Sequence, residues 1–449
     1  MNKTINPSDL FSSEILNYQV ETGKYGTTNY VNLDNAATTP PLKVVEEGMK
    51  KYLTGYGSVH RGAGTKSKIS TDMYEESRDV IKEFINAPAD SYVLLTENTT
   101  EAMNVAAYFM SFLKGKVAVS AIEHSSSWLP WIKTEGIKSL GSEQVDIEKM
   151  DEMNKKIQIA GREQVLQYDV NENFEFDESS IEKVLQNNKI KAVVLTASSN
   201  INGYCPEIKK IGEIVHKYGA YFIVDACQFM QHHEVDMQEM GIDFLAASGH
   251  KFYAPLGEGF LVGPKEFFDK FLPYQIGGGN LPYITEQGEF LRYKNQLAHD
   301  PGTPNAVGAV ALSLALNELK RIGLKNIEKY EKNLAQKLFD YMASNPKVDL
   351  FVSEKHLNTV IPFRIKGLES VEVAERLNSE YGIGTRAGSF CVYHVIRKLL
   401  KIEDESEIIE SVKNGQTNKI PSLVRASIGL CNTEADIDRM IEAISEIAK

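Results

Sequence analysis

The sequence predicts an α/β protein in which a large, mainly parallel sheet is followed by a smaller α+β domain. From about Tyr92 to Val262, short continuous apolar runs alternate with helix-length segments, as parallel strands covered by helices on both faces do. After about Asn305 the chain changes to long amphipathic helices. We therefore expect a large domain over residues 27–304 and a small domain made of residues 1–26 and 305–449.

Six apolar runs are expected to form strands: YVLLT (92–96), KVAVSA (116–121), AVVLTA (192–197), YFIVDA (221–226), FLAAS (244–248) and GFLVG (259–263). Between the third and fourth runs, EIKKIGEIVHKYGA has isoleucines at helical spacing and Gly219 as a stop signal. Such βαβ units place a binding site at the carboxyl ends of the strands. The charged segment from Gly136 to Asn173 does not fit this alternation of strands and helices, and we expect a solvated excursion or an inserted helix there.

The C-terminal part predicts three long helices, over residues 306–323, 326–344 and 433–449. In the last one, Thr433 and Asp436 are spaced as a capping box. Its apolar residues form one stripe, as in a helix that packs on a core: Ile437, Met440, Ile441 and Ile444.

Composition excludes several classes of protein. The 61 Asp and Glu against 49 Lys and Arg, a net charge of −12, argue against a nucleic-acid partner, because phosphate backbones select clustered basic residues. Four cysteines in 449 residues are too few for a disulfide framework and fit a reducing compartment. The N-terminus has no secretory h-region, and the run from Ala306 to Leu316 is shorter than the ~20 residues that span a bilayer. We expect a cytoplasmic protein without a membrane partner.

Lys251 and Asp225 are the first candidates for chemistry. Lys251 follows a buried strand in SGHKFYAPLGEG, where a partly desolvated lysine can form a Schiff base; alone, it fits an ordinary strand-to-loop turn better. Asp225 closes another strand, with Gln228 after it and Lys251 26 residues further on. Pyridoxal phosphate (PLP) needs an acid there to hold its ring nitrogen protonated, and this combination favours a PLP site over a simple strand-end Asp.

Two further strand ends carry polar residues. Thr96-Glu-Asn-Thr-Thr100 opens a helix, whose amides and hydroxyls could cradle a phosphate or could form a plain helix cap. His124 follows the strand that ends near Ala121. An imidazole there is structural, or it stacks on a planar ring or moves protons.

Longer motifs extend this pattern: VNLDNAATTP (31–40), VHRG (59–62), EH (123–124), LPW (129–131), DPGTPN (300–305), RAGSFC (386–391), VRAS (424–427) and NTEADID (432–438). With them the chain resembles the class V aminotransferase family of fold-type I PLP enzymes over about 400 residues. Within that family it is most similar to the SUF-type group of the cysteine desulfurase/selenocysteine lyase branch. The resemblance implies a seven-stranded, mainly parallel sheet plus a smaller α+β C-terminal domain, and PLP as the cofactor.

The resemblance also implies a role for each cofactor residue. Lys251 would carry PLP and act as acid and base at the substrate Cα, Asp225 would pair with the pyridine nitrogen, and His124 would stack on the ring with a catalytic role. The ring hydroxyl would be bonded by Gln228 and Asn200, and the phosphate by Thr99, Thr100, Ser248 and His250. Thr303 would reach the phosphate of a partner subunit, which implies a homodimer with its sites at the interface.

Substrate residues follow from the same resemblance. Asn35, Arg386 and Arg425 would bind the substrate carboxylate, and Cys391 would take the sulfur. Arg386 and a cationic pocket would favour the thiolate that this needs, although a free Cys can also be buried and inert. The remaining cysteines (Cys205, Cys227 and Cys431) are interpreted as packing residues. Cys391 and His394 have a metal-like spacing, but no second ligand pair accompanies them, so we expect no metal site.

The chain departs from the family pattern near the substrate. Ser389 and Phe390 replace two histidines, Ser125 replaces a second His, and the stretch from Cys391 to Arg425 contains a charged insertion at about 400–420. Gly64, Lys66 and Asn98 replace the His, Leu and Gly that the family usually has at these positions.

The leading hypothesis is a cysteine desulfurase that converts L-cysteine to L-alanine, with a persulfide on Cys391 passed to a sulfur-acceptor protein for iron–sulfur cluster assembly or thiolation. The alternative is a class V PLP enzyme without persulfide chemistry: a selenocysteine or cysteine-sulfinate lyase, an aminotransferase or an epimerase. A third hypothesis is a protein with the same fold that has no catalytic activity and acts as a scaffold.

Overall fold

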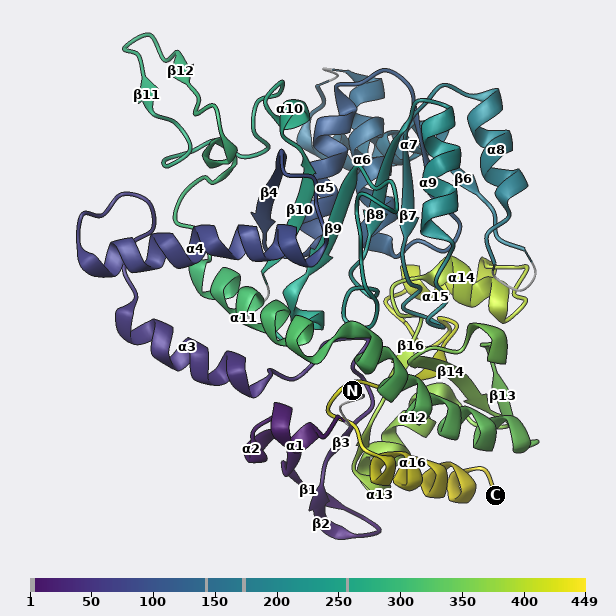
Figure 1. The fold of residues 1–449 in the computed structure, drawn as a ribbon. Helices are drawn as coiled ribbons and strands as arrows, with labels where there is room; N and C mark the ends of the chain where they lie inside the picture. Colours follow the sequence, from purple (N-terminus) through teal and green to yellow (C-terminus); the bar gives the residue numbers. More distant parts are fainter. Residues whose placement is uncertain (1–4, 142–143, 172–174, 256–257) are drawn as a thin grey trace. The chain divides into compact units, whose positions relative to one another are not determined.

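The computed structural model describes residues 5–141, 144–171, 175–255 and 258–449. The chain forms two compact units (Figure 1). Unit 1 consists of Met1–Lys43, Ser198–Cys205 and Ile322–Lys449, and unit 2 of Val44–Ala197 and Pro206–Arg321. The domain boundaries expected from the sequence, after residues 26 and 304, stay a prediction.

Unit 2 is built on a seven-stranded sheet with the order β4-β10-β9-β8-β7-β5-β6. Only β10 runs antiparallel to its neighbours, β4 and β9, while the other pairs are parallel. This confirms the predicted α/β fold class with a mainly parallel sheet. The strand bounds are β4 Ser91–Thr96, β5 Lys116–Ser120, β6 Val165–Tyr168, β7 Ile190–Thr196, β8 Tyr221–Asp225, β9 Phe244–Ser248 and β10 Gly259–Pro264.

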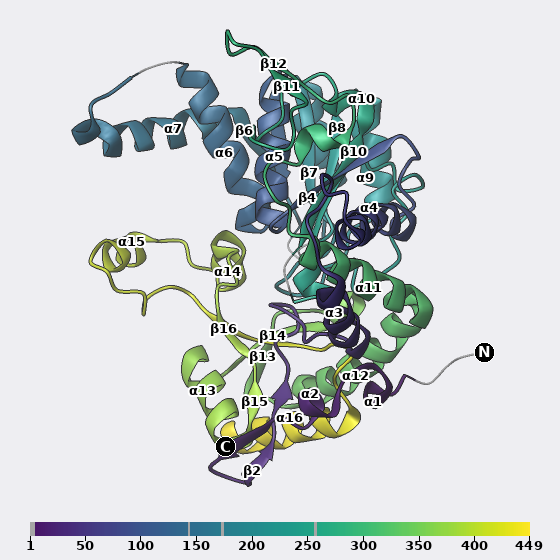
Figure 2. The same ribbon diagram turned by 90° about the vertical axis from the view of Figure 1, so that its left-hand side faces the viewer.

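Helices cover both faces of this sheet, with α5 and α6 on one face and α4 and α9 on the other (Figure 2). The central strands are therefore buried along their whole length, which explains their continuous apolar runs. The helices of unit 2 are α3 Lys43–Gly55, α4 Thr65–Phe84, α5 Thr99–Ser111, α6 Ser125–Leu140, α7 Met150–Gln164, α8 Glu178–Asn187, α9 Ile208–Lys217, α10 Lys265–Phe268 and α11 Ala306–Ile322. Short 3-10 turns (η1 Ile147–Lys149, η2 Gly249–Lys251, η3 Gln296–His299) and the hairpin β11 Tyr283–Ile284 and β12 Phe290–Leu291 complete the unit.

The segment from Gly136 to Asn173 contains more regular structure than expected. The inserted helix is present as α7, but β6 (Val165–Tyr168) was not predicted. It is the edge strand of the sheet and pairs in parallel with β5. A strand of four residues has little pattern of its own, and its pairing partner lies some 50 positions earlier in the chain. Positions 142, 143, 172 and 173 of this segment lie outside the described residues.

Unit 1 contains an antiparallel four-stranded sheet in the order β13-β14-β17-β16. Its helices α12 and α16 contribute Leu338 and Ile444 to a core with Phe363 of β14 and Val424 of β17. The capping box of Thr433 and Asp436 is present at the start of α16, as predicted. The strands are β1 Gln19–Thr22, β2 Gly26–Asn29, β3 Val31–Asn32, β13 Val348–Leu350, β14 Val360–Ile365, β15 Ile383–Gly384, β16 Arg386–Gly388 and β17 Leu423–Ser427. The helices are α1 Pro7–Leu10, α2 Ser13–Leu16, α12 Leu324–Ser344, α13 Ser370–Tyr381, α14 Tyr393–Leu399, α15 Ser406–Lys413 and α16 Glu434–Ile447, with η4 at Glu354–His356.

The charged insertion at about 400–420 carries α15, which follows α14 in unit 1. An ion pair between Arg397 and Glu405 ties the two helices together. Among the residues that the structure describes, none of the helices is both long and apolar enough to cross a membrane.

Candidate active site

The carboxyl edge of the large sheet gathers the predicted cofactor residues of unit 2. β8 ends at Asp225 and β9 ends at Ser248, directly before the turn that carries Lys251. β5 ends at Ser120, four residues before His124, and β4 runs in the same direction and ends at Thr96, before Thr99. Because these strands are parallel, their ends lie on one edge.

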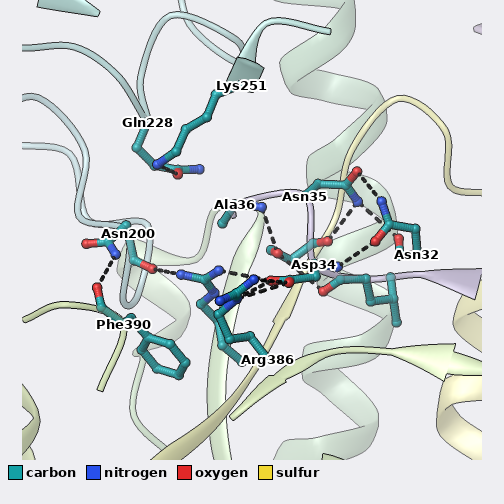
Figure 3. A network of polar contacts seen from close by, with 12 residues as sticks. Asn32, Asp34, Asn35, Ala36, Asn200, Gln228, Lys251, Arg386 and Phe390 are labelled. Atoms are coloured by element: carbon teal, nitrogen blue, oxygen red, sulfur yellow. Dashed lines mark hydrogen bonds and ion pairs between the residues drawn. The ribbon is translucent and has the colours of Figure 1, made fainter. Parts of the chain in front are cut away.

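Lys251 lies in the short turn η2 and points toward Gln228 (Figure 3). Its Nζ donates a hydrogen bond of 3.1 Å to Oε1 of Gln228. The other end of that amide, Nε2, is buried without a partner among the described residues. Gln228 therefore holds the lysine amine, and its NH2 group is left to donate to a ligand.

The carboxylate of Asp225 is buried and held on both oxygens. Oδ1 accepts from the backbone N–H of Cys227 at 3.0 Å, and Oδ2 accepts a short hydrogen bond from Oγ of Ser127. Ser127 lies in the first turn of α6 and is itself fully buried. These bonds fix the direction of the carboxylate, as a group that must face a ring nitrogen requires.

Glu123 is a second buried acid near Asp225. Its Oε1 accepts from the N–H of Thr196 at 2.6 Å and from the hydroxyl of Ser120, whereas Oε2 has no partner among the described residues. Burial, reinforced by the charge of Asp225, raises the pKa of Glu123 to about 8. Glu123 is therefore a neutral acid at neutral pH, behind the residue that the cofactor would meet.

The N-termini of α5 and α6 meet at the same edge. The hydroxyls of Thr100 and Ser126 lie 2.7 Å apart, and His124 caps α6 by accepting from the N–H of Ser126 at 3.2 Å. A Cβ on Gly259 would come within 2.5 Å of the backbone of Asn98, so the absence of a side chain there lets β10 approach the start of α5. Two helix N-termini side by side favour an anionic group such as phosphate.

Three further predicted residues complete the description of unit 2. The hydroxyl of Ser248 is fully buried without a partner among the described residues. Burial, with the charge of Lys251, lowers the pKa of His250 to about 4, so its imidazole is neutral. Thr303 lines a cavity of about 520 Å³ together with Thr96 and Glu258.

A second cluster lies within unit 1 and joins two arginines through Asp34 (Figure 3). Nη2 of Arg425 donates to Oδ1 of Asp34 at 3.0 Å, and Nη2 of Arg386 pairs with Oδ2 at 3.0 Å. Arg425 is almost fully buried, whereas the side chain of Arg386 is 50% exposed. Burial lowers the pKa of Arg425 to about 10, against the opposing effect of Asp34.

Cys391 follows β16 in a loop with unusual backbone angles. Phe390 and Cys391 have φ values of 53° and 58°, a left-handed region that costs non-glycine residues roughly 1–2 kcal/mol each. The ring of Phe390 packs 4.7 Å from the guanidinium of Arg425, and its carbonyl accepts from Nδ2 of Asn200 at 2.9 Å. These contacts hold the loop in its costly conformation, with the thiol of Cys391 exposed.

The other cysteines differ from Cys391 in their surroundings. Burial raises the pKa of Cys431 to about 12, and it also raises that of Cys227. Both are therefore kept as thiols, and thiols are poor nucleophiles. Cys205 is partly buried. Cys391 is the exposed member of the four.

Two residues expected to touch a ligand have their amides engaged in protein contacts. Nδ2 of Asn35 donates to Ser427 O at 3.0 Å and to Oδ1 of Asn432 at 3.1 Å. Nδ2 of Asn200 donates to the backbone carbonyl of Phe390 at 2.9 Å, and the backbone carbonyl of Asn200 accepts from Nη1 of Arg425 at 2.9 Å. Their roles toward substrate and cofactor stay predictions, and the structure adds Asn200 as a support for Arg425.

Sequence reasoning missed Asp34, Ser127 and the pairing of Glu123 with Thr196. Asp34 stands in the motif VNLDNAATTP next to the predicted Asn35. Ser127 is the last of three consecutive serines, and no local signal distinguishes it from the other two. Contacts such as Ser127 with Asp225 join residues that are far apart in the chain, so the pattern of the sequence does not reveal them.

Comparison with known families decides the classification. The family described as aminotransferase class-V matches residues 31–158 and 154–440. The chain belongs to the class-V aminotransferase family. A probable cysteine desulfurase from Pyrococcus abyssi is 33% identical over 435 residues, which cover 94% of this chain and 95% of that protein. A cysteine desulfurase from Wigglesworthia glossinidia brevipalpis is 28% identical over 95% of this chain and 94% of that protein.

Solved structures of cysteine desulfurases share the fold. An apo cysteine desulfurase from Thermococcus onnurineus NA1 has a TM-score of 0.77 and 28% identity, with 93% of this chain and 94% of that chain covered. A cysteine desulfurase from Escherichia coli has a TM-score of 0.76 and 25% identity, with 99% and 98% covered. The fold-type I expectation is therefore confirmed.

Class-V aminotransferases imply PLP as the cofactor, and unit 2 of this chain fits that group. A buried hydroxyl (Ser248) and a buried amide nitrogen (Gln228) have no partner among the described residues, and a bound cofactor would satisfy both. A buried carboxylate (Asp225), a lysine amine (Lys251) and two helix N-termini complete the set that a phosphorylated pyridine aldehyde requires.

Proposed function

We propose that this class-V aminotransferase is a PLP-dependent cysteine desulfurase that converts L-cysteine to L-alanine and leaves the sulfur as a persulfide on Cys391. The observation that carries the proposal is the exposed thiol of Cys391 on a loop in left-handed backbone conformation, tied to the two-arginine cluster of unit 1. The relatives named cysteine desulfurase align over more than nine-tenths of the chain, which supports the same activity.

PLP, when bound, supplies an electron sink for the bonds that break at the substrate carbons. Lys251 would hold the cofactor through its amine and would move a proton at the substrate Cα, while Gln228 orients that amine. Asp225 holds a proton at the pyridine nitrogen, and Ser127 keeps its carboxylate in place. His250 and Ser248, with Thr99 and Thr100, bind the phosphate, and His124 packs on the ring.

Arg425 and Arg386 bind the α-carboxylate of cysteine, and Cys391 accepts its sulfur. The thiolate of Cys391 attacks the substrate sulfur, so that an S–S bond forms as the carbon–sulfur bond breaks. Overall, cysteine plus a protein thiol gives alanine plus a protein persulfide, and this balance needs neither an oxidant nor a reductant. Neither Cys227 nor Cys431 serves, because burial keeps both protonated.

The protein acts as a homodimer, with Thr303 contributing to the partner's phosphate site, and it passes sulfur to an acceptor protein. Exposed apolar side chains on the β11–β12 hairpin support an interface: Tyr283, Ile284 and Leu291. A cytoplasmic location agrees with four free cysteines. Light scattering of the wild type and of Ile284→Glu tests the dimer; a monomeric wild type would contradict it.

The activity is tested by alanine and sulfide release from L-cysteine in the presence of dithiothreitol and PLP. The wild type should form both products in equal amounts, and Lys251→Ala should form neither. Cys391→Ala should lose most of the activity. Undiminished desulfuration by Cys391→Ala, or conversion of amino acids without sulfur release, would replace this proposal by a class V lyase, aminotransferase or epimerase.

A further inference from the structure

Cys227 lies among the cofactor residues rather than in the hydrophobic core of unit 2. It follows Asp225 by two residues, and its backbone N–H donates to Oδ1 of that carboxylate at 3.0 Å. The positive charge of Lys251 and the negative charge of Asp225 both act on its thiol. The sulfur therefore lies near the two residues that would meet the aldehyde and the ring nitrogen of PLP.

The other neighbours of the sulfur belong to the predicted phosphate site. The hydroxyl of Thr99 and the backbone N–H of Ser248 approach the sulfur and favour its charged form. Thr99 begins α5, and Ser248 ends β9. The thiol of Cys227 is therefore enclosed by separate segments of unit 2 that meet at the carboxyl edge of the sheet.

Buried polar groups around this thiol indicate that a ligand belongs there. Oγ1 of Thr99, Oγ of Ser248 and Nε2 of Gln228 have no hydrogen-bond partner among the described residues. These three residues are only 6%, 0% and 4% exposed, and buried polar groups rarely stay unsatisfied in a native protein. A ligand that bonds Thr99 and Ser248 must come close to the sulfur of Cys227, which both residues adjoin.

The thiol is accessible as well as enclosed. Cys227 is partly exposed, as Cys205 is, whereas Cys431 is buried. A small reagent can therefore reach Cys227. The reaction should be slow, because burial raises the pKa of the thiol and only the thiolate is a nucleophile. Cys391, which is exposed, should react faster.

We propose that Cys227 is a modification site that controls cofactor loading: a group attached to its sulfur excludes PLP, and bound PLP shields the sulfur. The modification is thiol–disulfide exchange with a low-molecular-weight disulfide. The sulfur of Cys227 forms a new S–S bond with one sulfur of the reagent as the old S–S bond breaks, and the other half of the reagent leaves as a thiol with the proton. No further oxidant is needed, and a reducing thiol reverses the step.

This inference rests on the proposed function only in its cofactor. A substituent on the sulfur of Cys227 would occupy space that the ligand of Thr99 and Ser248 needs. Overfilling a packed site costs enough to weaken binding at least about tenfold.

The test treats the full-length protein, freed of PLP with hydroxylamine, with oxidised mercaptoethanol and then titrates it with PLP. Mass spectrometry of the peptide that contains Cys227 measures the extent of modification, and protein fluorescence gives the Kd of PLP. Cys227→Ala removes the thiol. Cys205→Ala is the matched control, because it removes the other partly exposed cysteine. Each protein is compared with its own untreated sample, so that the effect of the substitution itself on PLP binding cancels.

Treated wild type and treated Cys205→Ala should bind PLP at least about tenfold more weakly than their untreated samples, and dithiothreitol should restore the affinity. Cys227→Ala should bind PLP equally well before and after treatment. With PLP at about ten times its Kd, the modification of Cys227 in the wild type should be about tenfold slower, whereas the rate at Cys205 should not change.

Two results would overturn the proposal: a Cys227 that stays unmodified after prolonged treatment, and a modified wild type that binds PLP as tightly as the untreated protein. Should modification unfold the protein, Cys227→Met decides instead, because its longer side chain takes up the same space without a reaction. Weaker PLP binding in Cys227→Met than in Cys227→Ala supports the proposal, and equal binding contradicts it.

The same measurements separate this inference from the proposed function. A wild type that binds PLP but releases no sulfur from cysteine contradicts the proposed function, and the role of Cys227 is then decided by the PLP affinities alone. A wild type that desulfurates cysteine and whose PLP affinity is insensitive to treatment contradicts only the role of Cys227. An untreated wild type that does not bind PLP contradicts both.

Discussion

Replacement of Glu123 by Gln should stabilise the protein in a pH-dependent way. Oε1 of Glu123 accepts from Thr196 N and from the hydroxyl of Ser120, and glutamine keeps both bonds through its carbonyl oxygen. Oε2 has no partner among the described residues, so the new NH2 group replaces an atom that had none. The substitution therefore removes the titration of this side chain and little else.

The magnitude follows from the pKa of Glu123, which burial raises from 4.5 to about 8. The unfolded chain releases this proton near pH 4.5, whereas the folded chain keeps it until about pH 8. Stability is therefore lost as the pH rises between these values and is constant above them. The full difference corresponds to an upper limit of about 5 kcal/mol. Relaxation and water penetration reduce such costs, and we expect at least about 2 kcal/mol.

The assay is urea unfolding of the wild type and Glu123→Gln at pH 5, 7 and 9, followed by tryptophan fluorescence. Both tryptophans of the chain, Trp128 and Trp131, lie in α6 of unit 2, next to the site. The free-energy difference between the proteins should be small at pH 5 and grow by about 2 kcal/mol or more towards pH 9. Glu258, whose pKa is likewise raised to about 8 by burial, is present in both proteins and cancels.

The control is Glu148→Gln, at an exposed position in η1, which should show no growing difference. A stability difference for Glu123→Gln that stays flat across this pH range would refute the reasoning, because it would mean that Glu123 is ionised in the folded protein. A difference that grows with falling pH would refute it equally.

Three further substitutions test other contacts. Ser127→Ala removes the donor to Oδ2 of Asp225 and should lower the free energy of unfolding by about 2 kcal/mol and weaken PLP binding; unchanged PLP affinity by fluorescence titration would exclude its positioning role. Gly136→Ala places a Cβ 2.1 Å from the carbonyl oxygen of Ile157, so α6 and α7 should separate at a cost of about 1–3 kcal/mol. Limited proteolysis should then cut residues 144–171 faster than in Gly64→Ala, where a Cβ meets nothing within 4 Å, and equal rates would contradict this. Phe390→Ala removes the ring under Arg425 and should raise KM for cysteine about fivefold to thirtyfold, as loss of a buried cation–π contact does; an unchanged KM would exclude that support.

The sequence was sufficient for most of the large sheet, because its buried strands are continuous apolar runs, and most of them end in a polar residue. It failed at β6, where Val165–Tyr168 is short and lies among charged residues. That strand exists because β5 offers it a pairing edge, and such non-local pairing leaves no periodic signal. The long helices α11, α12 and α16 carry their own apolar stripes and were predictable.

The candidate site was likewise predictable only in part. Lys251 and Asp225 were found because strand ends concentrate chemistry at one sheet edge. Asp34 was passed over for its neighbour Asn35, because only the fold shows that Arg386 and Arg425 are opposite each other and need a counter-charge. Ser127 and Glu123 are linked to Asp225 and Thr196 across strands and helices that lie far apart in the chain.

The most direct measurement is mass spectrometry of the peptide that contains Cys391, after the PLP-loaded protein has been incubated with L-cysteine without reductant and then alkylated. A desulfurase that works through Cys391 should show one added sulfur atom on this peptide, in an amount that matches the alanine formed in a single turnover. The peptides with Cys205, Cys227 and Cys431 serve as internal controls and should remain unmodified. Alanine formation without added sulfur on Cys391 would contradict the account.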